Sequence, residues 1–209
     1  MARSSLFLFL VLISMATRAE KPWQDSPHGP MLERIIPPGF TPGMLPEPAS
    51  RGARLTRRYC VQCHNLANPA MHDAARWPSV VNRMVPRMEG KGNMGKLMSE
   101  MMAGVQAPSP GETRVIVAYH VKHGQNPIDP ARIPEVNAPS AEPFRLACGQ
   151  CHVLPDPRRH TAREWPAVVA RMQKNMEWMN RVVGSRAVPG EPQLRIEDID
   201  AFLIRYARR

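Results

Sequence analysis

The 209-residue sequence has few aromatic residues (6%), only four cysteines and a shortage of acidic side chains, 18 against 28 Lys and Arg. It also lacks a long apolar run. The N-terminal run from Leu6 to Met15 is about ten residues, whereas a transmembrane helix needs roughly 20. No later stretch is apolar enough to span a bilayer. Four cysteines would limit the chain to two disulfides or a small metal site.

The first residues are typical of a secretory signal. Arg3 provides a basic start, the apolar run follows, and small residues precede Glu20. We predict cleavage after Ala19, with Ala16 as the alternative site, or else an uncleaved N-terminal anchor. Either way the rest of the chain is expected outside the cytoplasm, and membrane association is expected only if the signal stays uncleaved.

The formal net charge is +10. Removing the signal takes away two positive charges, Arg3 and Arg18, and leaves +8. This surface favours acidic partner proteins or anionic membranes. A nucleic-acid role is not expected for an exported chain.

An internal duplication surrounds the cysteines. When Cys60 is aligned with Cys148, 16 of the 30 positions through Glu89 and Glu177 are identical without a gap. Two copies of one small module are therefore predicted. The identical pairs include Cys60/Cys148, Cys63/Cys151, His64/His152, Pro69/Pro157, His72/His160, Trp77/Trp165, Arg83/Arg171, Met84/Met172 and Met88/Met176.

Each copy contains C-x-x-C-H, the attachment signature of c-type haem. On a helix, two thiols three residues apart share one side and can form thioethers with two vinyl groups. The following histidine then supplies the proximal iron ligand. The predicted cofactor-binding residues are Cys60, Cys63, His64, Cys148, Cys151 and His152. The alternatives are a zinc site or two short disulfides, but zinc needs four ligands and the two cysteine pairs lie 88 residues apart.

These motifs resemble the two-domain dihaem cytochromes c of bacterial periplasms. The resemblance covers about residues 53–209 and is most specific at CVQCH and CGQCH. It implies an all-α fold of two tandem class I cytochrome c-like haem domains joined by a Pro-rich linker. In each domain a C-terminal helix would cross the helix that carries C-x-x-C-H. It also implies a periplasmic location and two covalently bound haem c groups with iron.

The predicted organisation has five parts: a signal peptide (1–19), a Pro-rich extended N-terminal segment (20–52), a first haem c domain (53–124), a linker (125–142) and a second haem c domain (143–209). Helices are predicted over 53–64, 77–88, 112–122, 143–152, 165–176 and 196–207. Pro86 is predicted to kink its helix or end it early. Modules of about 70 residues bury little core unaided, so haem is expected to supply apolar bulk.

A methionine thioether is the expected sixth iron ligand. Met88 and Met176 are chosen because they are present in both copies and lie near a helix end. Met84 and Met172 lie on the buried helix face, where core packing is the simpler interpretation. Other candidates are Met179 and the methionines of the run NMGKLMSEMMAG, which are Met94, Met98, Met101 and Met102.

His72 and His160 are the alternative sixth ligands, although each follows its proximal histidine by only eight residues. Hydrogen bonding beside Arg83 and Arg171 is the other role open to them. The resemblance further implies that the backbone at Pro69 and Pro157 accepts the second imidazole N–H. Trp77 and Trp165 are expected either to reach a haem propionate or to pack as core aromatics.

Two protein ligands on each iron leave no coordination site for a substrate. The predicted function is therefore electron transfer between redox partner proteins with acidic docking surfaces, and not catalysis. One alternative is an electron-transfer subunit of a larger dehydrogenase or reductase complex. A second is a haem enzyme with a labile methionine ligand.

Overall fold

The computed structural model describes residues 22–93, 95–184 and 194–209. The predicted signal peptide, with Ala16 and Ala19, and the ligand candidate Met94 lie outside these ranges. The described chain is mostly helical and contains no strand, which confirms the all-α prediction. Its α-helices are α1 (Gly29–Leu32), α2 (Arg51–Tyr59), α3 (Trp77–Met88), α4 (Lys96–Met101), α5 (Pro110–His123), α6 (Glu142–Cys148), α7 (Trp165–Val183) and α8 (Ile196–Arg205). None of these helices combines the length and apolar character needed to cross a membrane.

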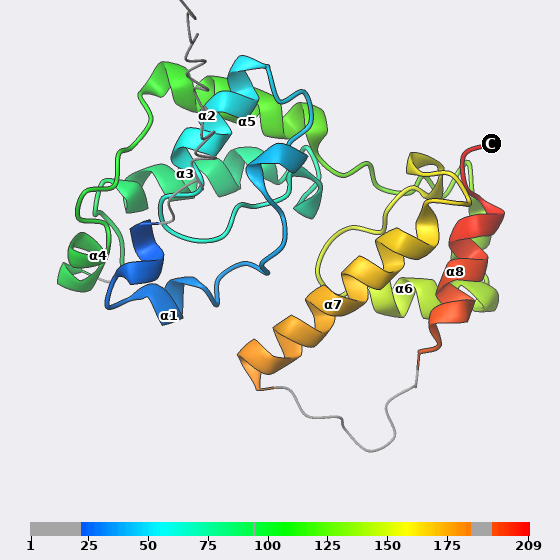
Figure 1. Ribbon diagram of the computed structural model, residues 1–209. Coiled ribbons are helices and arrows are strands. Elements are labelled where there is room, and N and C mark those ends of the chain that lie inside the picture. Colours follow the sequence, from blue (N-terminus) through cyan, green and yellow to red (C-terminus); the bar gives the residue numbers. More distant parts are fainter. Residues whose placement is uncertain (1–21, 94, 185–193) are drawn as a thin grey trace, which may run out of the picture.

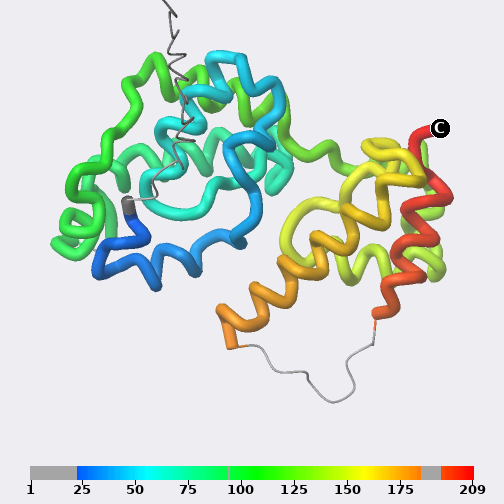
Figure 2. The backbone as a smooth tube through the Cα atoms, in the orientation of Figure 1, coloured from blue at the N-terminus to red at the C-terminus, as the bar shows by residue number. Residues whose placement is uncertain are grey.

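The helices form two groups that follow one another along the chain (Figure 1). In the first group α5 packs against α2 and α3, and in the second α8 packs against α6 and α7. Each group therefore uses its last helix to cross its first, as the duplication leads one to expect. The backbone tube in Figure 2 shows α1 and α4 beside the first group, away from α8 and the C-terminus.

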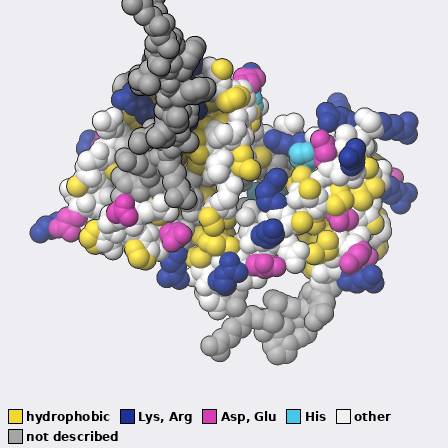
Figure 3. All heavy atoms as spheres, viewed as in Figure 1, with side chains coloured by type: hydrophobic (Ala, Val, Ile, Leu, Met, Phe, Trp, Pro, Cys, Tyr) yellow, Lys and Arg dark blue, Asp and Glu magenta, His cyan; other side chains and the backbone are white. Residues whose placement is uncertain are grey.

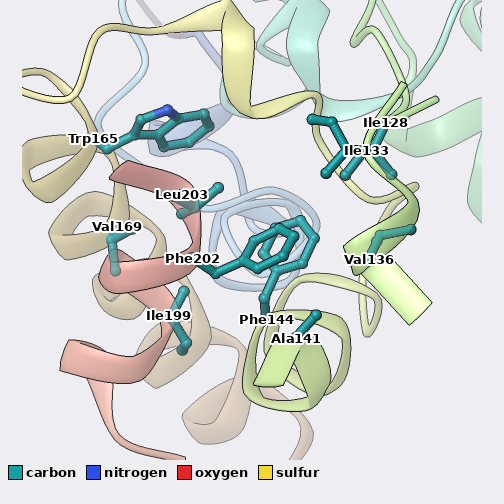
Figure 4. Close-up of a cluster of buried hydrophobic side chains, with 10 residues drawn as sticks. All are labelled: Ile128, Ile133, Val136, Ala141, Phe144, Trp165, Val169, Ile199, Phe202 and Leu203. Carbon is teal, nitrogen blue, oxygen red and sulfur yellow. The ribbon is translucent and has the colours of Figure 1, made fainter. Parts of the chain in front are cut away.

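The core of the second group is aliphatic and aromatic (Figure 4). Phe144 of α6 stacks on Phe202 of α8 with ring centroids 4.7 Å apart. Three side chains of the predicted linker, Ile128, Ile133 and Val136, are buried in the same cluster. The segment 125–142 is thus packed onto the second group, because its apolar side chains complete that core.

In the first group the equivalent crossing is tighter and more polar. Gly52 of α2 faces Tyr119 of α5 so closely that a Cβ at position 52 would lie 2.5 Å from the Tyr119 Cβ. The Thr56 hydroxyl lies 3.3 Å from Nε2 of His120, and both side chains are buried. His120 also stacks against Trp77 at a centroid distance of 4.1 Å.

The two helices that lead into C-x-x-C-H end earlier than predicted. The predicted helix 53–64 ends at Tyr59 with Cys60 as its C-cap, and the predicted helix 143–152 ends at Cys148. The rest of each C-x-x-C-H motif forms turns, which bring the imidazole against the next peptide carbonyl. Pro86 does not end α3 early, since the helix runs on to Met88. A proline in the last turn costs only one backbone hydrogen bond.

The second copy has a longer middle helix than predicted. Gly90, with φ 71°, follows the end of α3, whereas α7 continues past Met176 to Val183 and is capped by Gly184 with φ 70°. The residues 88 positions after Pro86 and Gly90 are Lys174 and Trp178, which allow the helix to continue. The left-handed conformation that stops each helix is the one that glycine adopts without strain.

The N-terminal segment 20–52 is not uniformly extended. Short helical turns occur at Pro22–Asp25, at α1 and at Pro42–Met44. The buried side chains Trp23 and Leu32 pack against Met98 and Met102. This segment therefore covers part of the first group.

Candidate functional site

Both C-x-x-C-H segments leave the end of a short helix, α2 or α6, and their four thiols are free in the structure. Burial raises the pKa of Cys60 to about 12, that of Cys63 to about 11 and that of Cys148 to about 12. These thiols are accordingly protonated at neutral pH. The predicted disulfide alternative is not present in the structure, and Cys151 is solvent-exposed.

The histidine of each motif points one ring nitrogen at the carbonyl of the following residue. The distance from Nδ1 is 2.6 Å to the Asn65 oxygen for His64, and 2.8 Å to the Val153 oxygen for His152. A carbonyl only accepts hydrogen bonds, so Nδ1 carries a proton in both rings, and in the neutral form Nε2 keeps its lone pair. Burial lowers the pKa of His64, which favours this neutral form.

The carbonyls of Pro69 and Pro157 have a different partner from the one expected. They accept the indole N–H of Trp77 at 2.8 Å and of Trp165 at 2.7 Å, respectively. Both indoles are buried, so their N–H groups serve to fix the loop after C-x-x-C-H to the middle helix. The carbonyl that orients the histidine of each motif is instead the nearer one, at the adjacent residue.

Beside the first motif lies a small hollow, partly open to solvent, which is lined by Phe40, Pro42, Val61, His64 and Leu66 among others. The N-terminal segment therefore supplies one wall and the C-x-x-C-H segment the other. An apolar wall beside an imidazole whose Nε2 is free matches the chemistry that a haem site needs. The two reduced thiols fit its covalent attachment.

The Met102 sulfur lies 3.5 Å from the Cys63 sulfur. Met98 is buried in the same cluster. The side-chain amide of Gln62 binds the end of the segment that carries Met98 and Met102. It donates to the Gln106 carbonyl at 3.1 Å and accepts from the Gln106 N–H at 2.9 Å. The segment 95–106 is thereby fixed over the first motif.

Met88, the sixth ligand predicted for the first copy, packs against the cluster of Tyr59, Trp77, Val81 and Ile116. Met84 is half-buried on the same helix. In the second copy Met172, Met176 and Met179 are all half-buried on α7. No methionine follows Met179 in the sequence, so the second copy has no counterpart of the Met98 and Met102 segment.

His72 and His160 occupy matching positions. Each ring meets a tryptophan edge-on, His72 with Trp77 at 5.2 Å and His160 with Trp165 at 4.8 Å between centroids. Burial lowers the pKa of both histidines. Arg83 and Arg171 are solvent-exposed.

Sequence reasoning missed the buried pair Thr56 and His120. Burial lowers the pKa of His120 to about 4, and its Nδ1 is buried without a hydrogen-bond partner. A signal was present in the duplication, because the position four residues before the first cysteine is Thr56 in one copy and Phe144 in the other. A polar residue in place of an aromatic core residue indicates a polar partner.

No group of three or more His, Cys, Asp and Glu side chains that could hold a metal ion occurs among the described residues. The chain matches no family model, no curated protein and no solved structure.

Proposed function

We propose that this protein is a periplasmic dihaem c-type cytochrome that transfers electrons between redox partners. The observation that carries the proposal is the repeated arrangement of two free thiols and an imidazole whose Nδ1 faces a carbonyl, at 2.6 Å in one copy and 2.8 Å in the other. In both copies the chain presents the chemistry of a c-type haem site, and all four cysteines are used.

Bound haem iron would supply a centre that changes charge by one electron. Cys60 and Cys63 would hold one haem and Cys148 and Cys151 the other, with His64 and His152 as proximal ligands. The carbonyls of Asn65 and Val153 keep each imidazole in the tautomer that leaves Nε2 free, and fix the ring orientation. The two tandem haem domains would then coincide with the two helix groups.

For the first site we propose Met102 as the sixth ligand, with Met98 as its nearest competitor. Both thioethers belong to the cluster around Cys63, whereas Met88 fills space between α3 and its neighbours. For the second site the ligand would come from α7, where Met176 remains the choice beside Met172 and Met179. A methionine ligand raises the potential and keeps the iron closed to substrates.

The partners are proposed to be proteins with acidic docking surfaces. The formal net charge is +10, and the side chains of Arg51, Arg54, Arg57 and Arg58 on α2 are all exposed. On the face shown in Figure 3, Lys and Arg are spread over both groups with Asp and Glu among them. Charge of this kind accelerates encounter and makes it sensitive to salt.

The test is to produce the full chain in a bacterium that attaches haem c in its periplasm. Intact mass and optical spectra should show two covalent haems per chain, and replacing Cys63 with Ser or Cys151 with Ser should each disturb one. In the oxidised protein a thioether-to-iron charge-transfer band is expected. Carbon monoxide should leave the reduced spectrum unchanged.

Two results would contradict the proposal. A purified periplasmic chain without covalent haem would remove its basis. Rapid carbon monoxide binding by a haem would show an open or labile site and would favour the enzyme alternative. A partner that copurifies in fixed proportion would favour the subunit of a larger complex.

A further inference from the structure

Gln125 lies where the chain passes from the first helix group to the second, and it is bonded to both. Its backbone N–H donates to the His72 carbonyl at 2.9 Å. Its side-chain Nε2 donates to the Val153 carbonyl at 2.9 Å. Gln125 is almost fully buried, with 4% of its surface exposed. The orientation of its amide follows from chemistry, since the opposite orientation would set two oxygens against each other.

The Val153 carbonyl is the same group that receives Nδ1–H of His152. The Val153 carbonyl oxygen therefore accepts two hydrogen bonds, one from the histidine of the second site and one from the Gln125 side-chain amide. On the other side, the His72 carbonyl also accepts the indole N–H of Trp77 at 3.1 Å. A continuous chain of hydrogen bonds thus joins the Trp77 loop of one copy to the His152 ring of the other.

The duplication supplies a comparison within the molecule. Arg208 occupies the place of Gln125 in the second copy, since its backbone N–H donates to the His160 carbonyl at 3.0 Å. Its side chain, however, is exposed and lies 3.9 Å from Glu164. The backbone contact is therefore a property of the module, whereas the side-chain contact with Val153 belongs to Gln125 alone.

We propose that Gln125 is a positioning residue that couples the two sites by sharing the Val153 carbonyl with His152. The role rests on the proposed function, because it concerns His152 as an iron ligand. Two donors that share one acceptor weaken each other, so the Gln125 amide limits the hydrogen bond from Nδ1–H of His152. A weaker bond leaves less electron density on the imidazole, which favours the reduced iron.

The test is the variant Gln125→Met in the full haem-loaded chain, since methionine has a similar shape and no N–H to donate. Redox titrations would be followed by NMR through the ring resonances of His64 and His152. Loss of one neutral hydrogen bond should lower the reduction equilibrium constant of the His152 haem by about two- to fivefold. The constant of the His64 haem should stay unchanged.

Arg208→Met is the matched control and should change neither constant. A Gln125→Met protein with an unchanged His152 haem, or with both haems shifted equally, would overturn the coupling role. In the unaltered protein, slow exchange of the Gln125 side-chain amide protons should report the buried contact, and rapid exchange would overturn it without any variant. A chain that holds no covalent haem would instead refute the proposed function on which this role rests.

Discussion

Replacing Gly52 with Ala tests a close contact between α2 and α5. The new Cβ would lie 2.5 Å from the Tyr119 Cβ and 2.7 Å from its Cγ. Ordinary carbon contacts are about 3.5–4.0 Å, so α2 and α5 would have to separate by about 1 Å. Rotating the Tyr119 side chain cannot relieve this contact, because its Cβ is fixed to the backbone. The Tyr119 hydroxyl also donates to the Pro46 carbonyl at 2.7 Å, a bond that such a shift would strain.

Overpacking of this kind costs about 1–3 kcal/mol, and the helix propensity of Ala returns up to about 1 kcal/mol. We expect Gly52→Ala to lower the free energy of unfolding by about 1–2 kcal/mol in urea denaturation of the haem-loaded protein. Because Cys60 caps the same helix, the spectrum of one haem should also change.

Gly111→Ala in α5 is the matched control. A Cβ there would have only the Arg114 guanidinium at 3.9 Å as a neighbour, so the change should be neutral or stabilising by up to about 1 kcal/mol. A Gly52→Ala protein as stable as Gly111→Ala would show that α2 and α5 do not cross in this way.

Three further predictions concern the first group. Met102→Ala should abolish the thioether-to-iron band of one haem and open that haem to carbon monoxide. Met88→Ala should leave the spectra of both haems unchanged and lower the free energy of unfolding by about 1–2 kcal/mol, because its side chain is half-buried. The reverse pattern would restore Met88 as the ligand. Burial lowers the pKa of His120 to about 4. The unfolded chain therefore gains a proton below about pH 6.5 before the folded one, and stability is lost as the pH falls toward 4, by up to about 3 kcal/mol. The second copy has Leu203 at this place, since Leu203 precedes Arg208 by five residues as His120 precedes Gln125. His120→Leu should therefore flatten the pH dependence of the unfolding free energy, measured by urea titration at pH 5 and 7. An unchanged pH dependence would contradict the buried neutral histidine. Trp23→Ala should cost about 3 kcal/mol and Trp23→Phe about 1 kcal/mol, since Phe keeps the packing and loses the 3.1 Å hydrogen bond to Val61. Equal losses would show that the hydrogen bond to Val61 alone matters and would contradict the packing role.

The sequence predicted the helical class because its apolar spacing is strong and its prolines lie between the helices. The apolar residues at helical spacing are buried, Ile116 and Tyr119 in α5 and Ile199, Phe202 and Leu203 in α8. Helix ends were less predictable, because they depend on local bonds that spacing does not encode. The turn after Cys60, for example, brings His64 to the Asn65 carbonyl and has no periodic signature.

Long-range contacts were the least predictable part of the site. Nothing in local sequence connects Trp23 to Met102, or Gln125 to Val153, because these contacts depend on how distant segments fold together. The tryptophan partners were missed for a related reason. A buried indole N–H takes the nearest free carbonyl, and at Pro69 and Pro157 that carbonyl is provided by the loop itself.

The two copies share the contacts around C-x-x-C-H but differ in the side chains that pack between their first and last helices. The bond from tryptophan to proline and the carbonyl beside each histidine recur, and these contacts fix the geometry around C-x-x-C-H. The side chains at the helix crossing do not recur, since Phe144 and Leu203 stand where the first copy has Thr56 and His120. The stability of a hydrophobic crossing does not depend on pH. A crossing with a buried neutral histidine becomes less stable in acid, because the histidine is protonated more readily in the unfolded chain. The duplication has thus preserved two similar C-x-x-C-H segments inside helix groups that should respond differently to acid.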